Sequence, residues 1–188
     1  MRKVVLLLAA VLMVLTTNAW ARGPMDLLLE AGQAYQKKDY HQAITRLQTA
    51  LEDIWNEAPL AVVNAHFTDN EPKGFGDFQP RANSVFSSLE PVRLYYEIIG
   101  AVPKKTAKAY KTSLSYDFRV IDDTGQVLGG QKGLKGVELD SSFFSTQVMM
   151  YLTLNFKGLA EGRYTLEITL HDNHSSKTAT HKMPFEIK

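Results

Sequence analysis

Residues 113–120 have the sequence Ser-Leu-Ser-Tyr-Asp-Phe-Arg-Val, and this stretch decides the fold. Apolar and polar side chains alternate along it, which is the pattern of a β-strand with one face buried and the other in water. The same alternation recurs in further C-terminal stretches, namely residues 93–98, 148–156, 163–170 and 179–187. These repeated patterns predict antiparallel strands over most of residues 59–188.

Turn-forming residues separate the predicted strands, at positions 122–125, 161–162 and 172–176. Aspartate, asparagine, glycine and serine at such positions favour tight turns. Many short strands at this spacing are typical of an immunoglobulin-like β-sandwich, and a closed barrel is the alternative. We therefore expect residues 59–188 to form a β-sandwich domain.

Before residue 59 the apolar period is that of a helix. Apolar residues form one helical stripe at Ala43, Ile44, Leu47, Ala50, Leu51 and Ile54. Asp39 is a suitable N-cap for this helix, with Gln42 three residues later as in a capping box. A preceding segment has Leu27, Leu28, Ala31 and Tyr35 at compatible spacing, with Lys37 and Lys38 expected in its last turn. The pattern predicts an antiparallel helical hairpin over residues 22–58.

This hairpin resembles a single tetratricopeptide-type repeat, although Lys38 stands where such repeats have a turn glycine. The residues that resemble the repeat are Gly32, Ala34, Tyr35, Asp39, Tyr40, Ala43, Ile44, Ala50 and Leu51. The chain contains no second copy, and such repeats bury their apolar faces by stacking. The stripe must therefore be covered by the chain's own β domain or by a partner chain. Bulky Met149 and Tyr151 on the otherwise polar face of a strand suggest the β domain, so we expect an α+β fold with the hairpin packed on that face.

Residues 61–188 resemble a group of uncharacterised exported bacterial proteins with a C-terminal β-sandwich. The similarity is carried by residues 75–78, 80–83, 85–86, 90–97, 122–125, 127–130, 172–179 and 184–187. It implies the fold and export, and it implies no functional site.

The first 21 residues have the three parts of a secretory signal peptide. Arg2 and Lys3 precede an apolar run of residues 4–15, and Ala19-Trp20-Ala21 supplies small residues for cleavage after Ala21. The chain has no cysteine, so a disulfide, a thiol nucleophile and a lipid-anchoring cysteine are all excluded. No later apolar run reaches about 18 residues, the least that a membrane-spanning helix needs. We expect a periplasmic protein without a stable membrane anchor.

Charge and motifs exclude several function classes. The mature chain keeps 19 of the 21 Lys and Arg and all 20 Asp and Glu, because only Arg2 and Lys3 fall in the leader. This balance does not favour nucleic-acid binding. The sequence has no nucleophile elbow and no phosphate-binding glycine loop. We therefore expect neither enzymatic activity nor a cofactor, and the sequence leaves the oligomeric state open.

One cluster contains possible metal ligands. His171, Asp172 and His174 lie near a predicted hairpin tip, where nitrogen and oxygen ligands suit zinc or copper. Their spacing matches no established metal motif. The favoured interpretation is a polar turn that Asp172 caps through its side chain.

A long connection rich in glycine and proline, residues 73–86, contains Phe75, Phe78, Arg81 and Phe86. Long ordered loops with aromatic residues and arginine often form recognition surfaces, although these rings could instead attach the loop to the sandwich. Trp55 at the end of the second helix has the same two interpretations. These residues favour a non-enzymatic module that binds an envelope protein, with a cell-envelope glycan as the alternative ligand.

Overall fold

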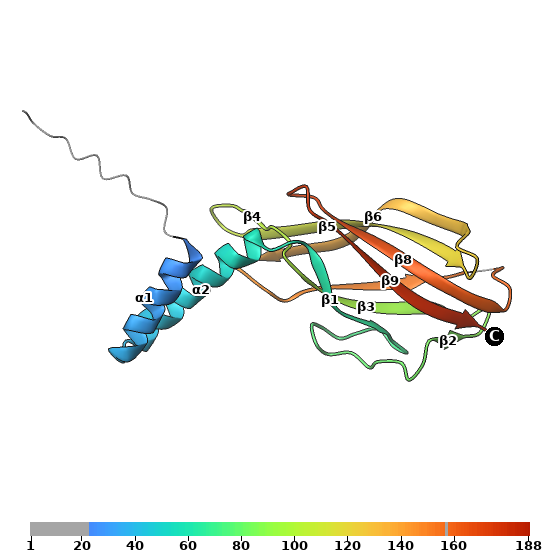
Figure 1. Cartoon of the computed structure of the whole chain (residues 1–188), viewed down its shortest axis with the longest axis horizontal. Helices are drawn as coiled ribbons and strands as arrows, with labels where there is room; N and C mark the ends of the chain where they lie inside the picture. The colour runs from blue at the N-terminus through green and yellow to red at the C-terminus, as the bar shows by residue number, and fades with distance from the viewer. Residues whose placement is uncertain (1–22, 157) are drawn as a thin grey trace, which may run out of the picture.

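The computed structural model describes residues 23–156 and 158–188, so the predicted leader lies outside the described residues. Two helices, α1 (Pro24–Gln36) and α2 (Tyr40–Glu57), form an antiparallel hairpin. Figure 1 shows this hairpin at one end of a β domain, with the C-terminus at the opposite end. In the described part of the chain, neither helix is long and apolar enough to span a membrane.

The turn between the helices confirms part of the predicted capping. Asp39 Oδ1 accepts a hydrogen bond from the backbone N–H of Gln42 at 3.1 Å. Lys37 and Lys38 follow α1 and do not lie in its last turn, so that prediction was wrong. Lys38 has a φ of 60°, a conformation in which glycine is the least strained residue.

The interface between the helices is built mainly from alanine. Leu27, Ala31 and Ala34 of α1 are buried with Ala43 and Ala50 of α2. Short side chains let two helices approach closely, but they bury little apolar area. An ion pair between Glu30 and Arg46, with Nε and Oε2 3.0 Å apart, closes one side of this interface.

The β domain consists of two sheets. The smaller has the order β1-β3-β7, and the larger has the order β2-β9-β8-β5-β4, with β6 also paired to β5. The strands are β1 (Ala61–Phe67), β2 (Val85–Phe86), β3 (Val92–Ile99), β4 (Lys104–Lys105), β5 (Tyr110–Asp122), β6 (Val127–Ser141), β7 (Val148–Leu154), β8 (Gly162–Asp172) and β9 (Thr178–Ile187). All pairings are antiparallel except the short parallel contact of β2 with β9.

The apolar core lies between the two sheets. It contains most of the predicted inward residues of β3, β5, β7, β8 and β9, namely Leu94, Tyr96, Ile98, Leu114, Val120, Val148, Met150, Leu152, Leu166, Ile168, Leu170, Met183, Phe185 and Ile187. Tyr96 on one sheet donates a hydrogen bond to Met183 Sδ on the other at 3.2 Å. The alternation in the sequence therefore predicted the buried faces correctly, and the α+β class is confirmed.

The hairpin joins the β domain through the last turn of α2. Trp55 Nε1 donates a hydrogen bond to Ala101 O at 2.7 Å, and the Trp55 ring is buried. Lys177 Nζ donates to the carbonyl oxygens of Asn56 at 2.6 Å and of Ala58 at 2.6 Å. The lysine therefore satisfies backbone groups that a helix end leaves unpaired.

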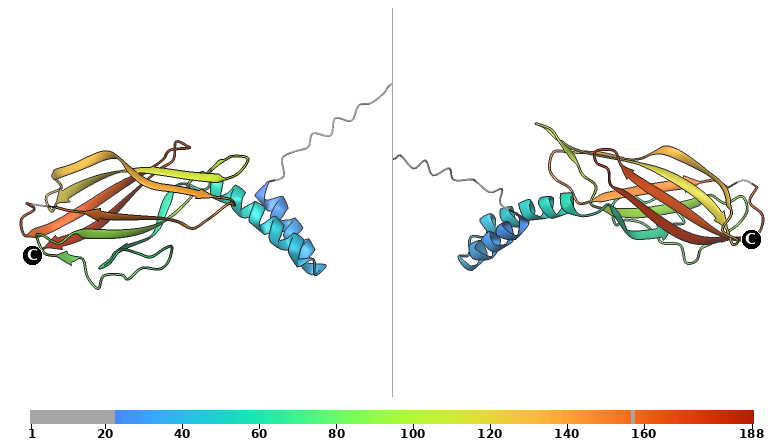
Figure 2. Two further views of the ribbon diagram at one scale, coloured as in Figure 1. Left: turned by 180° about the vertical axis from the view of Figure 1, so that it is seen from behind. Right: turned by 45° about the horizontal axis from the view of Figure 1, so that its top comes forward.

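The hairpin does not cover the outer face of β7, contrary to expectation. Both views in Figure 2 show it as an arm beyond the end of the sheets. Tyr151 lies opposite Tyr95 of β3, and the ring of Phe78 stacks on Tyr95 with centroids 4.0 Å apart. The connection between β1 and β2 therefore packs on this sheet, whereas Ile44, Leu47, Leu51 and Ile54 of the α2 stripe stay exposed.

Candidate interaction surface

A continuous apolar stripe runs along α2. Its residues and their exposed fractions are Tyr40 (54%), Ile44 (56%), Leu47 (49%), Leu51 (45%) and Ile54 (43%). They recur at spacings of four, three, four and three residues. This spacing aligns side chains along one seam and is the pattern with which one helix packs against another.

Helix α1 extends the same apolar surface. Leu28 and Tyr35 are exposed, and the Tyr35 ring meets the Tyr40 ring edge to face with centroids 5.8 Å apart. At helical spacing both residues lie on the side of α1 opposite Glu30, just as the stripe lies on the side of α2 opposite Arg46. We call this surface the hairpin face, formed by Leu28, Tyr35, Tyr40, Ile44, Leu47, Leu51 and Ile54.

The border of the hairpin face toward solvent is uncharged along most of its length. Helical spacing places Gly32 of α1 and His41 and Gln48 of α2 there. Glu30 and Arg46 form their ion pair on the other side of the hairpin. Association through this surface would thus bury apolar side chains without removing an ion pair from water.

A groove adjoins the hairpin face where α2 meets the connection between β6 and β7. It has a volume of ≈ 410 Å³ and is lined by Thr45, Gln48, Thr49, Leu51, Glu52, Phe143, Phe144 and Thr146. Phe144 is fixed against Trp55, with ring centroids 6.0 Å apart, whereas Phe143 is 69% exposed. The exposed Phe143 ring therefore extends the apolar surface from α2 onto the β domain.

The structure places most of the predicted binding residues in packing roles. Phe78 is stacked on Tyr95, and Phe86 is only 1% exposed, with its ring against Phe67 and Phe185. The Trp55 ring pairs with Phe144. Phe86 and Trp55 are both buried, as expected of rings that attach the loop and the helix to the sandwich. Phe75 keeps 39% exposure.

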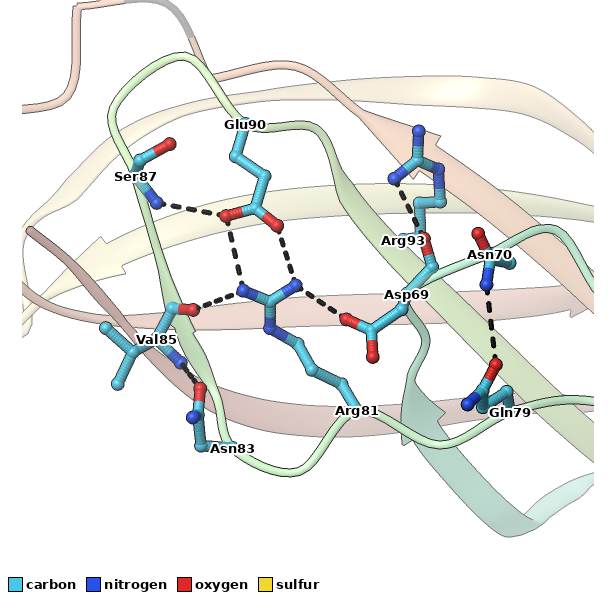
Figure 3. Close-up of polar contacts among 9 residues, drawn as sticks. All are labelled: Asp69, Asn70, Gln79, Arg81, Asn83, Val85, Ser87, Glu90 and Arg93. Atoms are coloured by element: carbon cyan, nitrogen blue, oxygen red, sulfur yellow. Dashed lines mark hydrogen bonds and ion pairs between the residues drawn. The ribbon is translucent and has the colours of Figure 1, made fainter.

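Arg81 is bound on several sides (Figure 3). Its Nη1 donates to Asp69 Oδ1 at 2.9 Å and to Glu90 Oε1 at 2.6 Å, and its Nη2 donates to Glu90 Oε2 and to Val85 O. The guanidinium also lies over the Phe86 ring, 4.4 Å from its centroid. Arg81 therefore stabilises the loop through a bidentate ion pair with Glu90 and a cation–π contact with Phe86.

This network makes the stability of the loop depend on pH, through the ionisation of Glu90. Burial pushes the pKa of Glu90 up, but hydrogen bonds from Arg81 and the Ser87 N–H outweigh it, so the pKa lies below its ordinary value. A lowered folded-state pKa stabilises the fold above the unfolded pKa of about 4.3, and this stabilisation is lost as the pH falls through the folded pKa. We expect Glu90→Gln to reduce the free energy of unfolding in urea at pH 7, and the difference from wild type to shrink below about pH 4.3. A difference independent of pH would contradict this role of the Glu90 charge.

The possible metal ligands have other partners. His171 Nε2 lies 3.2 Å from Asp117 Oδ2, and Asp172 accepts hydrogen bonds from the N–H groups of Val102 and His174, both at 2.9 Å. Asp172 thus caps the turn, as the favoured interpretation predicted. Among residues 23–156 and 158–188, no group of three or more acidic or histidine side chains is placed to hold a metal ion.

No family model matches the chain, and no curated protein is significantly similar to it. Three solved structures show partial similarity in their arrangement. One is the alkylpurine DNA glycosylase AlkC of Pseudomonas fluorescens, bound to DNA with an abasic-site analogue. It is 12% identical with a TM-score of 0.38, and the match covers 87% of this chain and 42% of the glycosylase chain. CopC of Methylosinus trichosporium OB3b is 11% identical with a TM-score of 0.33, and the match covers 66% of this chain and 94% of the CopC chain. Superoxide reductase of Ignicoccus hospitalis is 11% identical with a TM-score of 0.34, and the match covers 68% of this chain and 82% of the reductase. Similarities this low assign neither a fold family nor a function, and this chain spans less than half of the glycosylase.

Proposed function

We propose that the mature protein is a periplasmic, non-enzymatic binding protein that contacts a partner protein through its hairpin face. In this proposal the β domain is an immunoglobulin-like sandwich that serves as the scaffold, and the hairpin is the arm that binds. The observation that supports it is the hairpin face itself: seven apolar side chains, each between 37% and 65% exposed, along one side of two helices.

The energetic argument starts from how little the hairpin buries within its own chain. Its interior is mainly alanine, whereas its larger apolar side chains lie outside. Exposed apolar surface costs about 25 cal/mol for each Å² that remains in water. Contiguous apolar patches of this kind mark sites of association. A partner that covered the face would recover this free energy.

The geometry favours a protein over a glycan. Spacings of four and three residues match the side-chain rows of another helix, and the groove beside Phe143 lengthens the surface that a helix would meet. The glycan alternative depends on exposed aromatic rings of the loop on which a sugar would stack. Phe78 and Phe86 of the loop are already packed, which leaves Phe75 as the exposed phenylalanine of that segment. The glycan alternative therefore has less support.

The shifted carboxyl groups of the β domain also favour a scaffold over an enzyme. The pKa of Glu167 is lowered chiefly by the hydrogen bond from Arg119, and Lys182 Nζ lies 3.4 Å from its other oxygen. The pKa of Glu90 is lowered by Arg81 in a separate network. Glu167 lies between the two cations Arg119 and Lys182, and Glu90 is paired with Arg81, as in structural ion-pair networks.

Site-specific photo-crosslinking in living cells tests the proposal. We expect a crosslinking amino acid at position 47 to yield a discrete adduct with an identifiable envelope protein or with a second copy of this chain. The matched control is position 42, which lies on the other side of the same helix and is exposed. Equal crosslinking from positions 42 and 47, or none from position 47, would refute binding through the hairpin face.

A further inference from the structure

We propose that the partner of the hairpin face is a second copy of this chain, with two hairpins packing face to face as a four-helix bundle. This inference rests on the proposed function, because it names the protein that occupies the same surface. In such a dimer the two copies contribute the same residues, as in any isologous two-fold interface.

The size of the surface matches what a dimer requires. Aromatic side chains present on the order of 150–250 Å² when fully accessible, and leucine and isoleucine present less. The seven are roughly half exposed, so the hairpin face offers on the order of 600 Å². A standard protein–protein interface takes about 800 Å² from each partner. Phe143 at the adjoining groove adds to this area. Two hairpin faces can therefore form a complete interface.

The charge pattern favours an identical partner. When helices select a different partner, charged residues beside the apolar seam usually make the choice. Here His41 and Gln48 border the seam, and the Glu30–Arg46 pair lies on the other side. No like charges would face each other when two copies meet. The seven side chains of the hairpin face include no charged group that would discriminate against a second copy.

Gly32 provides an independent observation. It continues the apolar row of α1, four residues after Leu28 and three before Tyr35, and a Cβ added there would meet nothing within 4 Å. Glycine inside a helix destabilises it relative to alanine, so a glycine that its own chain does not require needs another explanation. A second hairpin that approaches closely over Gly32 supplies one.

The shape of the molecule leaves the surface accessible. The hairpin projects beyond the end of the β domain in both views of Figure 2. Two arms can therefore lie against each other while the two β domains point away from the bundle. The junction at Trp55 and Lys177 fixes the direction of each arm, which limits the entropy lost when two arms meet.

The test is the molar mass of the mature chain, measured by light scattering and sedimentation at concentrations on the order of 50 µM, where a standard-size interface is populated. We expect wild type to have twice the mass of one chain. Leu47→Glu should weaken dimerisation about 100-fold or more, because it places an unpaired charge at the centre of the interface. The matched control Gln42→Glu, on the other side of α2, should remain dimeric.

Gly32→Leu separates loss of the dimer from misfolding. Leucine favours the helix and its side chain starts in open space within one chain, so this variant should fold with a circular dichroism spectrum like that of wild type. It should nevertheless dissociate at concentrations at which wild type is a dimer. A folded, fully dimeric Gly32→Leu protein would refute the proposed contact, and a monomeric wild type would refute the dimer.

The two proposals fail in different ways. A monomeric wild type whose position 47 crosslinks to a different envelope protein would overturn the dimer and leave the proposed function intact. A monomeric wild type without a crosslink from position 47 would overturn both.

Discussion

Replacing Trp55 by alanine is expected to lower the free energy of unfolding by about 3–5 kcal/mol, the range for truncating a buried tryptophan. Trp55 is 8% exposed, its ring meets Phe144, and its Nε1 donates to Ala101 O at 2.7 Å. The alanine variant loses this packing and leaves a buried carbonyl without its donor. Since Trp55 joins the arm to the β domain, hydrogen exchange in α2 should also become faster in the variant.

Urea unfolding of wild type, Trp55→Ala and Trp55→Phe measures this effect. Phenylalanine keeps most of the ring packing and loses the hydrogen bond, so its cost should be smaller, about 1–3 kcal/mol. All three proteins should be compared below the concentration at which they associate, because association adds to apparent stability. A Trp55→Ala cost below about 1 kcal/mol would show that the junction is not a packed part of the fold.

Most of the β domain was predictable because its strands bury one face. In β3, the residues Leu94, Tyr96 and Ile98 are buried and alternate in sequence with residues on the outer face. This period of two arises directly from strand geometry. The turn at Asp122 was predictable for a local reason as well, since its Oδ1 accepts from the N–H groups of Thr124 and Gln126.

Strand β6 was not predicted, because its sequence lacks the one-sided alternation. It pairs with β5 along one edge only, and Val127 and Leu128 at its start are both exposed. The strand also contains four glycines, at positions 129, 130, 133 and 136. The first half of the strand, residues 127–133, is exposed on both faces, and a glycine-rich strand of this kind leaves little periodic signal, so its register is set by the neighbouring strand.

The sequence predicted the apolar stripe of α2, but it did not predict which residues of that stripe are exposed. The stripe contained Ala43 and Ala50, which α1 covers, together with Ile44, Leu47 and Leu51, which remain exposed. Helical period alone does not show which part of a stripe another element covers. The loop of residues 73–86 illustrates the reverse case, because aromatic residues that attach a loop to its own sheet have the same composition as a recognition surface.

Replacing Phe86 by alanine is expected to lower the free energy of unfolding by about 3–5 kcal/mol. Phe86 is 1% exposed, its ring lies against Phe67 and Phe185, and the guanidinium of Arg81 covers it. It also pairs with Ile187 where β2 meets β9. The truncation opens a cavity at the point where the loop, β1 and the C-terminal strand meet, so its cost should exceed that of any other phenylalanine in the loop.

The matched control for Phe86→Ala is Phe75→Ala in the same loop. Phe75 is 39% exposed, so its truncation should change the free energy of unfolding by less than about 0.5 kcal/mol. Urea denaturation of both variants separates the two roles that the sequence left open. If Phe75→Ala cost as much as Phe86→Ala, the exposed ring would belong to the core. If Phe86→Ala were nearly neutral, the loop would not be anchored by its aromatic residues, and a ligand-binding role for Phe78 and Phe86 would return to consideration.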